Sequence, residues 1–544
     1  MPYSPSRASN LAIGVTLGTL SLLLAACSVP GPGDGGSGTI NTKVVAQGPA
    51  SGLTGLDVSI VVERAARAVS DSPITIAVVD REGNILGVFS RPAPTAASAA
   101  TEEVAVGLAR TGAFFSNDSA PLSSELIRFL SREHFPENVL NTPSADLFGI
   151  EHTNRGCPLT GGPLTVPYVD AAHFVPPATN IAGTDPGPGI ICRPGGFPLY
   201  KNNRLVGGVG VSGSADPVNE FAGLTATTGY QLEAADPGKI FLGGIILPYL
   251  AAGGRGERPT GTVPGDFPGS GAFRGGIPGI PVAGVRDSPV VAAPFAPEGY
   301  LIGPADGALI SAVEVDGIVQ AAVRQANLTR AAIRLPAGSK ASMVIAVAEA
   351  VGNATVSRGA LLALFRMPDA TVFSIDVAAA KARNVIYFSD TAHFPGDLPG
   401  VPPGTAVTNR TIGFGAQSMY PSGIDGSGPG PFRALFLHDL AYPCTQGQDP
   451  GNDFGPPAAI PPMNPITSIT NRNGIVFFPG STPLYRNGAM VAGLGVSGDG
   501  VAQDDVVTNA AAHGYLPPPA IRADQLILDD VRLPYFKFSR SPEQ

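Results

Sequence analysis

The chain has 544 residues, of which 44% are hydrophobic and 14% are charged, and its net charge is −9. The hydrophobic fraction is enough for real cores, and the acidic balance, with no basic run, excludes a nucleic-acid surface. The 70 glycines and 55 prolines predict long ordered loops.

The N-terminus is typical of a bacterial lipoprotein signal over residues 1–27. A positively charged start precedes an apolar stretch, Leu11–Ala26, that is short for a membrane span of about 20 residues. We expect Cys27 to become the lipidated first residue and residues 28–52 to form a flexible tether. Because Ser28 rather than Asp follows the cysteine, we expect an outer-membrane protein that faces the periplasm or the surface. A single transmembrane anchor is the alternative.

The first folded region begins with a helix, a hairpin and a second helix. Residues 53–71 have apolar positions at helical spacing, with Thr54 as a possible N-cap. Residues 74–91 read ITIAVVDREGNILGVFSR, which predicts two strands joined by a turn, and residues 98–112 predict a helix. The order is α-β-β-α, and a further hairpin follows after a Gly/Pro-rich loop.

This further hairpin occurs twice in the chain. Residues 189–213 and 474–498 are identical at 14 of 25 positions, at an offset of 285. Each copy predicts a strand, a polar turn and a strand in which Gly alternates with Val or Leu, so that another element packs close to the backbone. Each copy ends near a serine, Ser212 or Ser497, which we expect to cap the following helix. A repeat of this length indicates two homologous domains rather than a solenoid.

The repeat suggests where the domains begin and end. We predict domain 1 at residues 53–250, a surface linker at 251–300, domain 2 at 301–536 and a tail at 537–544. The linker contains 20 Gly and Pro among its 50 residues. The second domain repeats the order of the first, with a helix at 309–326, strands at 343–351 and 359–367, and a helix at 374–384.

Three stretches make the pattern specific. The VVDREGNILGVF hairpin, the segment SIDVAAAKAR, and PGSTPLYRNGAMVAGLGVSG followed by QDD resemble the GlcG/HbpS-type haem-binding family, also called the haem-degrading domain. The resemblance covers most of 53–250 and 305–536. It implies an α/β (α+β) fold of two tandem profilin-like domains, each an antiparallel sheet of about five strands flanked by helices. It also implies oligomers and, in some members, binding of haem or a related tetrapyrrole.

The resemblance further implies ligand-binding residues, mainly in domain 2. Arg366, Lys381 and Arg383 are expected to pair with propionates or another carboxylate. The full predicted set is Arg366, Lys381, Arg383, Tyr485, Asp504 and Asp505. Domain 1 has Leu108 near the place of Lys381 and Val218-Asn219-Glu220 in place of Gln-Asp-Asp, so we expect at most one strong site, in domain 2. A salt-bridge network made by the same charges is the alternative.

Histidines and cysteines give weaker signals. None of the six histidines has a paired metal-ligand spacing. His152 and His438 lie at near-matched places in the two repeats and are the candidates for an axial haem ligand. Cys157 and Cys192 lie in the same repeat, which favours a disulfide between them in an exported chain, with Cys444 free. The alternatives are a bridge between Cys157 and Cys444 or three free thiols.

These features predict an exported protein, anchored to the membrane through Cys27, that binds haem or a similar tetrapyrrole or small acidic ligand. We expect a homo-oligomer with no nucleic-acid partner. A structural or assembly module of paired domains, without a cofactor, is the alternative. Peroxide-dependent haem degradation is a third function, and no acid-base pair or metal site in the sequence supports it independently.

Overall fold

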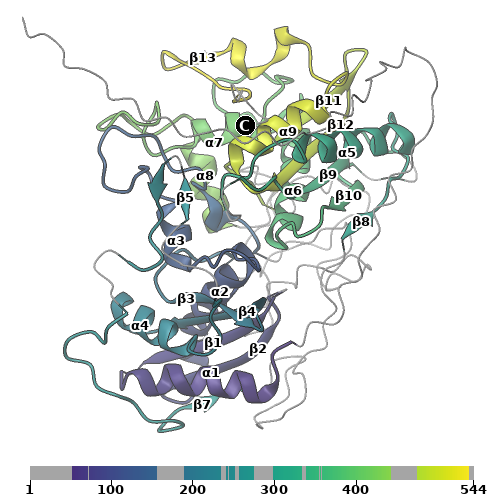
Figure 1. Ribbon diagram of the computed structural model, residues 1–544. Coiled ribbons are helices and arrows are strands. Elements are labelled where there is room, and N and C mark those ends of the chain that lie inside the picture. The colour runs from purple at the N-terminus through teal and green to yellow at the C-terminus, as the bar shows by residue number, and fades with distance from the viewer. Residues whose placement is uncertain are drawn as a thin grey trace, which may run out of the picture. The chain divides into compact units, whose positions relative to one another are not determined.

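The structure is a computed structural model. It describes residues 52–71, 73–81, 83–155, 189–233, 240–242, 244–251, 256–274, 298–333, 338–353, 356, 358–442 and 474–537. The predicted signal and tether lie outside these ranges. Within the ranges, no helix has both the length and the apolar character needed to cross a membrane. The α/β fold predicted for two tandem copies is confirmed, because the chain forms two antiparallel five-stranded sheets flanked by helices (Figure 1).

The first repeat forms a sheet in the order β3-β4-β1-β2-β7. Its strands are β1 (Ile74–Asp80), β2 (Ile85–Arg91), β3 (Gly196–Lys201), β4 (Arg204–Ser212) and β7 (Ala272–Phe273). Its helices are α1 (Gly55–Ala68), α2 (Ala99–Phe115), α3 (Ser124–Phe129) and α4 (Asp216–Ala226). A small hairpin of β5 (Phe241–Leu242) and β6 (Ile245–Ile246) follows α4.

The second repeat forms a sheet in the corresponding order, β11-β12-β9-β10-β8. Its strands are β8 (Gly299–Ile302), β9 (Met343–Glu349), β10 (Leu361–Arg366), β11 (Ser481–Arg486) and β12 (Ala489–Gly498). Its helices are α5 (Ala312–Ala326), α6 (Phe373–Phe388), α7 (Asn409–Gly415), α8 (Arg433–Ala441) and α9 (Val501–Ala511). The hairpin of β13 (Ile527–Leu528) and β14 (Val531–Arg532) follows α9.

Alternation along the central strand places helices on both faces of the sheet. In β1, Ile76 and Val78 belong to one core with residues of α1 and α4, whereas Ala77 and Val79 belong to a second core with residues of α2. All seven residues of β1 are buried, which explains why the strand reads as a hydrophobic run rather than as an alternating pattern.

Glycines bring the sheet and its inner helix together, as the sequence predicts. A Cβ added to Gly210 of β4 would collide with the carbonyl oxygen of Ala105 in α2. One added to Gly495 of β12 would collide with the carbonyl oxygen of Ala378 in α6. Only glycine therefore allows this separation between strand and helix.

The hairpin turns have the conformation that their residues predict. Asn202 and Asn203 have φ angles of 55° and 58°, and Asn487 and Gly488 have φ angles of 51° and 81°. Two successive left-handed residues make a turn whose twist matches that of the flanking strands. Asparagine and glycine adopt this conformation at the lowest cost.

The prediction that the hairpin serines cap the next helices was wrong. The N-cap positions of α4 and α9 are Ala215 and Gly500, three residues beyond Ser212 and Ser497. The Ser212 hydroxyl instead donates to the carbonyl oxygen of Thr101 at 2.6 Å. Each serine is still part of its strand, so its side chain reaches the helix packed on the sheet rather than the helix that follows.

The segment 251–300, predicted as a surface linker, supplies one edge strand to each sheet. β7 pairs with β2 through Phe273 and Phe89, whose ring centroids lie 5.6 Å apart. β8 pairs with β10, and Tyr300 packs against Phe365. Strands of two to four residues are too short to show alternation in a sequence. The domain boundaries themselves stay a prediction.

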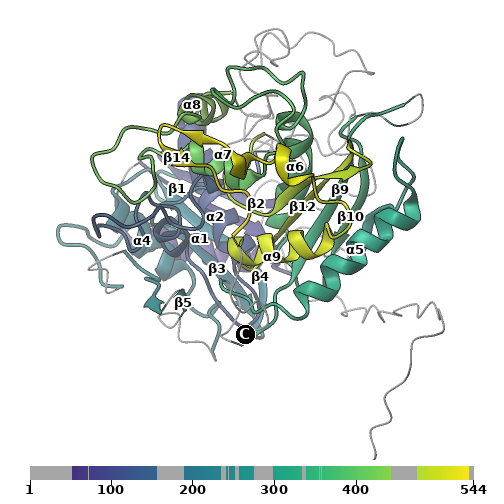
Figure 2. The same cartoon turned by 90° about the horizontal axis from the view of Figure 1, so that it is seen from above.

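The outer helices of the second repeat, α5 and α9, run side by side (Figure 2). The first helix of each repeat starts with a capping box, formed by Thr54 and Asp57 in α1 and by Ser311 and Glu314 in α5, so the predicted N-cap at Thr54 is confirmed.

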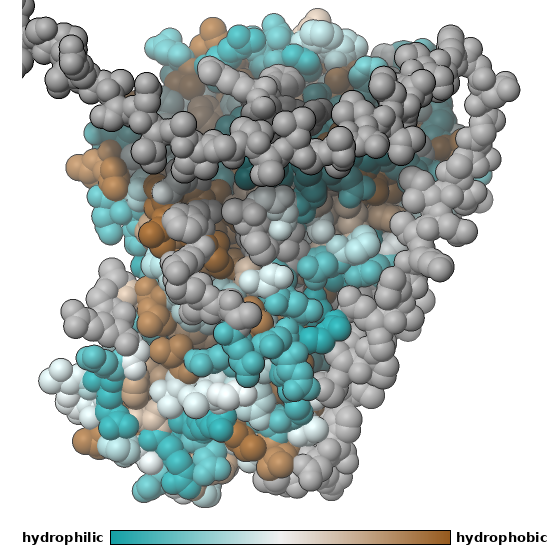
Figure 3. Space-filling view, viewed as in Figure 1, coloured by the Kyte–Doolittle hydropathy of each residue, from teal (hydrophilic) through white to brown (hydrophobic). Residues whose placement is uncertain are grey.

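On the face that Figure 3 shows, hydrophobic and hydrophilic residues are interspersed over the described part of the surface.

Candidate functional site

The predicted ligand charges centre on Lys381 of α6, which is fully buried. Its ammonium lies 2.9 Å from Oδ2 of Asp504 in α9 and donates a hydrogen bond of 2.8 Å to the carbonyl oxygen of Val496. Burial lowers the pKa of Lys381 and raises the pKa of Asp504 to about 7, while their mutual attraction opposes both shifts. The two side chains therefore pair with each other inside the protein and present no charge to solvent.

The two predicted arginines also bond internally. Arg383 is fully buried and donates from Nε to the carbonyl oxygen of Gly359 at 2.8 Å. Arg366 donates from Nε to the carbonyl oxygen of Ala370, also at 2.8 Å. These bonds hold α6 and β10 to the neighbouring loops, and a ligand carboxylate would have to displace them.

Asp505 and Tyr485 complete the predicted set, and both are buried. Asp505 accepts hydrogen bonds from Nε of Arg410 and, at 3.1 Å, from the backbone nitrogen of Gly480. Tyr485 belongs to a core cluster of buried side chains, and burial raises its pKa to about 12. The geometry is that of an internal salt-bridge network, and a ligand role for these residues stays a prediction.

His152, one of the two predicted axial ligands, is 1% exposed and packs against α8. Its Nδ1 lies 2.7 Å from Oδ2 of Asp439, and its ring centroid lies 4.1 Å from that of Phe436 and 4.8 Å from that of Phe477. Burial lowers the pKa of His152, so the neutral ring donates from Nδ1. Its Nε2 has no hydrogen-bond partner in the described ranges, and the rings of Phe436 and Phe477 pack against the imidazole.

The other predicted site residues are less constrained. The ring of His438 lies 4.9 Å from that of Tyr442, in and just after α8. Cys27, Cys157 and Cys444 lie outside the described residues, and Cys192 is buried and forms no disulfide with a described residue, so the bridge stays a prediction. Among the described residues, no group of three or more His, Cys, Asp and Glu side chains could hold a metal ion.

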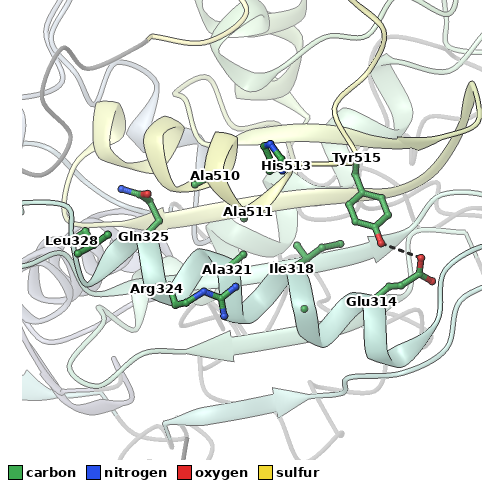
Figure 4. Close-up of a pocket in the computed structure, with 11 residues that line it drawn as sticks. Glu314, Ile318, Ala321, Arg324, Gln325, Leu328, Ala510, Ala511, His513 and Tyr515 are labelled. Atoms are coloured by element: carbon green, nitrogen blue, oxygen red, sulfur yellow. Dashed lines mark hydrogen bonds between the residues drawn. The ribbon is translucent and has the colours of Figure 1, made fainter. Parts of the chain in front are cut away.

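A groove with a volume of ≈ 630 Å³ lies between α5 and α9 (Figure 4). Ile318 and Ala511 are buried in its wall, and Ala321 and Ala510 are small. A Cβ added to Gly317 would meet no atom within 4 Å. Small side chains on both helices therefore leave a hollow between them, with apolar residues in part of its wall.

A fixed carboxylate lies at one end of the groove. Glu314 accepts a hydrogen bond of 3.0 Å from the hydroxyl of Tyr515 (Figure 4) and lies 2.5 Å from Nη1 of Arg486. Hydrogen bonds from the backbone and side chain of Ser311 lower the pKa of Glu314 to about 2. Glu314 is therefore ionised at neutral pH and holds the phenol and the guanidinium in place.

An imidazole and a cation line the rest of the groove. His513 follows α9, Arg324 lies in the last turn of α5, and both are exposed. Neither side chain has a hydrogen bond or an ion pair with a described residue. The groove therefore combines apolar residues with an exposed imidazole and an arginine that has no ion pair with a described residue.

The sequence analysis did not single out His513 or Arg324 as site residues. His513 aligns with Thr228 at the offset of 285, so the repeat gave it no support. Arg324 falls on the polar face of an amphipathic helix, where a charge is ordinarily just solvated. The available signal was the i, i+4 pair of Gly317 and Ala321, because two small residues one turn apart leave a hollow on a helix surface.

Comparison with known proteins finds one matching family. The family model described as "Haem degrading protein HbpS-like" matches residues 58–220 and 318–513. The solved structures of the Klebsiella pneumoniae protein ORFY and of a PduOC–haem complex are each 17% identical to the chain, with a TM-score of 0.22. Each match covers 37% of this chain. It covers 86% of the ORFY chain and 92% of the PduOC chain. No curated protein matches the chain.

Proposed function

Because the chain belongs to the HbpS-like family of haem-degrading proteins, we propose that it binds haem or a similar tetrapyrrole in the groove between α5 and α9. The observation that carries this proposal is the combination of His513, Arg324 and an apolar wall around one hollow. These are the three features that a planar macrocycle with an iron and carboxylates would require.

The groove has the dimensions and chemistry for such a ligand. A volume of ≈ 630 Å³ lies within the range of about 300–1,000 Å³ that small-molecule sites occupy. Burying the ring against Ile318, Ala321 and Ala511 would supply most of the affinity, at about 25 cal/mol per Å² of apolar surface. Arg324 would pair with a propionate and fix the orientation of the ring.

His513 is better suited than Tyr515 to ligate the iron. A tyrosine ligates iron as a phenolate, but burial raises the pKa of Tyr515, and its proton is held against Glu314. An imidazole such as that of His513 ligates iron through one ring nitrogen and keeps the N–H proton on the other. When bound, haem would supply redox chemistry at its iron, and the chain would hold and orient it.

Glu314 is not suited to act as a catalytic acid in this groove. A catalytic acid at neutral pH would need a pKa near 7. The carboxyl group at this site, Glu314, has a pKa lowered to about 2 and is committed to Arg486 and Tyr515. Glu314 would therefore hold and orient its neighbours rather than transfer a proton in peroxide-dependent degradation.

Titration of the apo protein with haemin tests the proposal. We expect a saturable Soret shift with a stoichiometry near one. His513→Ala should shift the Soret maximum and weaken binding at least tenfold, and Arg324→Ala should weaken binding about fivefold, or ~1 kcal/mol. Arg330→Ala, an exposed arginine outside the groove, is the control and should bind as the unaltered chain does. A linear, unsaturable response would instead favour the structural-module function.

We also propose that the protein is exported and anchored by a lipid on Cys27. The apolar segment that ends at Ala26 supports this proposal, and both residues lie outside the described ranges. Cys27→Ser should abolish labelling by a radioactive fatty acid and release the protein from the membrane fraction or leave it unprocessed. Unchanged labelling and fractionation would contradict the anchor.

A further inference from the structure

The groove of the second repeat has a counterpart in the first repeat, built on the same framework. The hydroxyl of Tyr230 donates to Asp57 at 2.7 Å, as Tyr515 donates to Glu314. Lys201 lies 2.8 Å from Asp57, in the place of Arg486. The paired helices α1 and α4 therefore meet in the same way as α5 and α9, and the two helix pairs can be compared position by position.

Counting from the two capping boxes aligns α1 with α5 at an offset of 257, since Asp57 corresponds to Glu314. At this offset Arg64 stands in the place of Ala321, and Ile60 stands in the place of Gly317. At the offset of 285, Thr228 stands in the place of His513. Two small residues of the open groove are thus replaced by large ones, and the imidazole is lost.

Arg64 lies across the space that is open in the second repeat. Its Nη1 donates a hydrogen bond to the carbonyl oxygen of Thr228, just beyond α4. Its guanidinium carbon lies 5.8 Å from the centroid of the Tyr230 ring, at a distance typical of a cation–π contact. A side chain that starts on α1 and bonds beyond the end of α4 bridges the two helices.

The first repeat also differs from the second in the charge around the corresponding helix pair. Arg67, in the place of Arg324, pairs with Glu63 at 2.7 Å, whereas α5 has Gln320 at the place of Glu63. The first repeat therefore neutralises the cation that the second repeat leaves available. The segment 256–274 also covers the last turn of α1, because the backbone nitrogen of Gly265 donates to the carbonyl oxygen of Arg67 at 3.1 Å.

We infer that the first repeat holds a closed form of the ligand groove, with Arg64 as its internal occupant. Arg64 blocks a planar, carboxylate-bearing ligand in the first repeat, and Ala321 leaves room for one in the second. The chain consequently binds one such ligand, in the second repeat. This inference rests on the proposed function, because it assigns Arg64 its role relative to the same ligand.

Exchanging the residue at this position tests the inference with haemin as the probe. Ala321→Arg should close the groove of the second repeat and weaken haemin binding at least tenfold. Val313→Arg is the matched control, because it adds the same charge to the same helix at a residue that is 82% exposed. It should leave the affinity unchanged. Equal affinities for Ala321→Arg and the unaltered chain would overturn the inference, whereas weaker binding by His513→Ala would still support this groove as the haemin site.

The reverse exchange should create a second site. The quadruple variant I60A/E63Q/R64A/T228H gives the first repeat small residues at both helix positions, an unpaired arginine and an imidazole, as in the open groove, and titration should show two haemins per chain. We expect the second to bind at least tenfold more weakly, because the segment 256–274 still covers one end of α1. A stoichiometry of one, with unchanged far-UV circular dichroism and urea midpoint, would overturn the inference. An unaltered chain that binds no haemin would contradict the proposed function instead.

Discussion

Lys381 and Asp504 form a buried ion pair 2.9 Å long in the second repeat, and Leu108 and Asn219 take the same places in the first. The equivalence follows from the glycines that these side chains contact: Gly495 and Gly480 in the second repeat, and Gly210 and Gly195 in the first. The same fold therefore accommodates either an ion pair or an uncharged pair at this point between the sheet and two helices.

This relationship predicts the outcome of a double-mutant cycle. Lys381→Leu alone would leave Asp504 buried without its partner. Asp504→Asn alone would leave Lys381 buried without its partner. Each should cost about 3–5 kcal/mol of unfolding free energy. The double variant restores an uncharged pair of the first-repeat type and should lose less than about 1.5 kcal/mol. Urea unfolding of the four proteins measures the cycle, and additive losses would show that the pair is not coupled.

Close packing of β12 on α6 makes a second prediction. Gly495→Ala should destabilise the protein by about 1–3 kcal/mol, because the added methyl group collides with the backbone of Ala378. Gly317→Ala is the control, since it places the same methyl group in open space within a helix and should stabilise by about 0.5–1 kcal/mol. Thermal unfolding should separate the two variants by several degrees. Similar melting temperatures would show that the strand and helix move apart at low cost.

The long elements of the fold could be predicted from the sequence because their signals are local. The apolar spacing of residues 53–71 and the two asparagines at 202–203 each specify a helix or a turn without reference to other residues. The edge strands β7 and β8 could not be predicted, because they are short and are defined only by pairing with β2 and β10.

The residues of the candidate site, too, could be predicted only in part from the sequence. The sequence singled out Lys381 and Asp504 as charges of interest but gave no measure of burial, so it left the ligand and salt-bridge interpretations open. His513 was not predicted as a site residue, because histidines were judged by whether they recur in both repeats and His513 has no match in the first repeat. A difference between repeats proved more informative here than a similarity, because it is Arg64 and Ala321 that distinguish the two helix pairs.

Glu220 of α4 predicts a pH dependence of stability. Burial raises its pKa to about 6, although a hydrogen bond of 2.7 Å from the backbone nitrogen of Ala251 acts in the opposite direction. The folded state thus holds this proton more tightly than the unfolded state, whose carboxyl has a pKa of 4.5. The stability that Glu220 contributes is therefore present below pH 4.5 and is lost as the pH rises through 6.

Glu220→Gln should remove this dependence, because glutamine keeps an acceptor for Ala251 and does not titrate. The free energy of unfolding of the unaltered protein, relative to that of the variant, should fall by about 1 kcal/mol between pH 4.5 and 6.5, after allowance for solvent screening. Urea unfolding at several pH values measures the difference. Parallel pH profiles would mean that Glu220 titrates normally in the folded state.

His152 predicts a pH dependence in the opposite direction. Burial is the main cause of its lowered pKa; Asp439 and Glu151 oppose the shift, and Arg155 adds to it. The folded state therefore binds this proton less tightly than the unfolded state, where the pKa is 6.5. The stability that His152 contributes is present above pH 6.5 and is lost as the pH falls below that value.

His152→Asn tests this directly, because asparagine can still donate to Asp439 but carries no titrating group. Between pH 7 and 5 the unaltered protein should lose more unfolding free energy than the variant. The comparison with the variant isolates His152, since all other titrating groups are common to both proteins. A nuclear magnetic resonance titration of the His152 ring should show it neutral in the folded state at pH 6. A ring that is protonated there would mean that attraction to Asp439 outweighs the cost of burial.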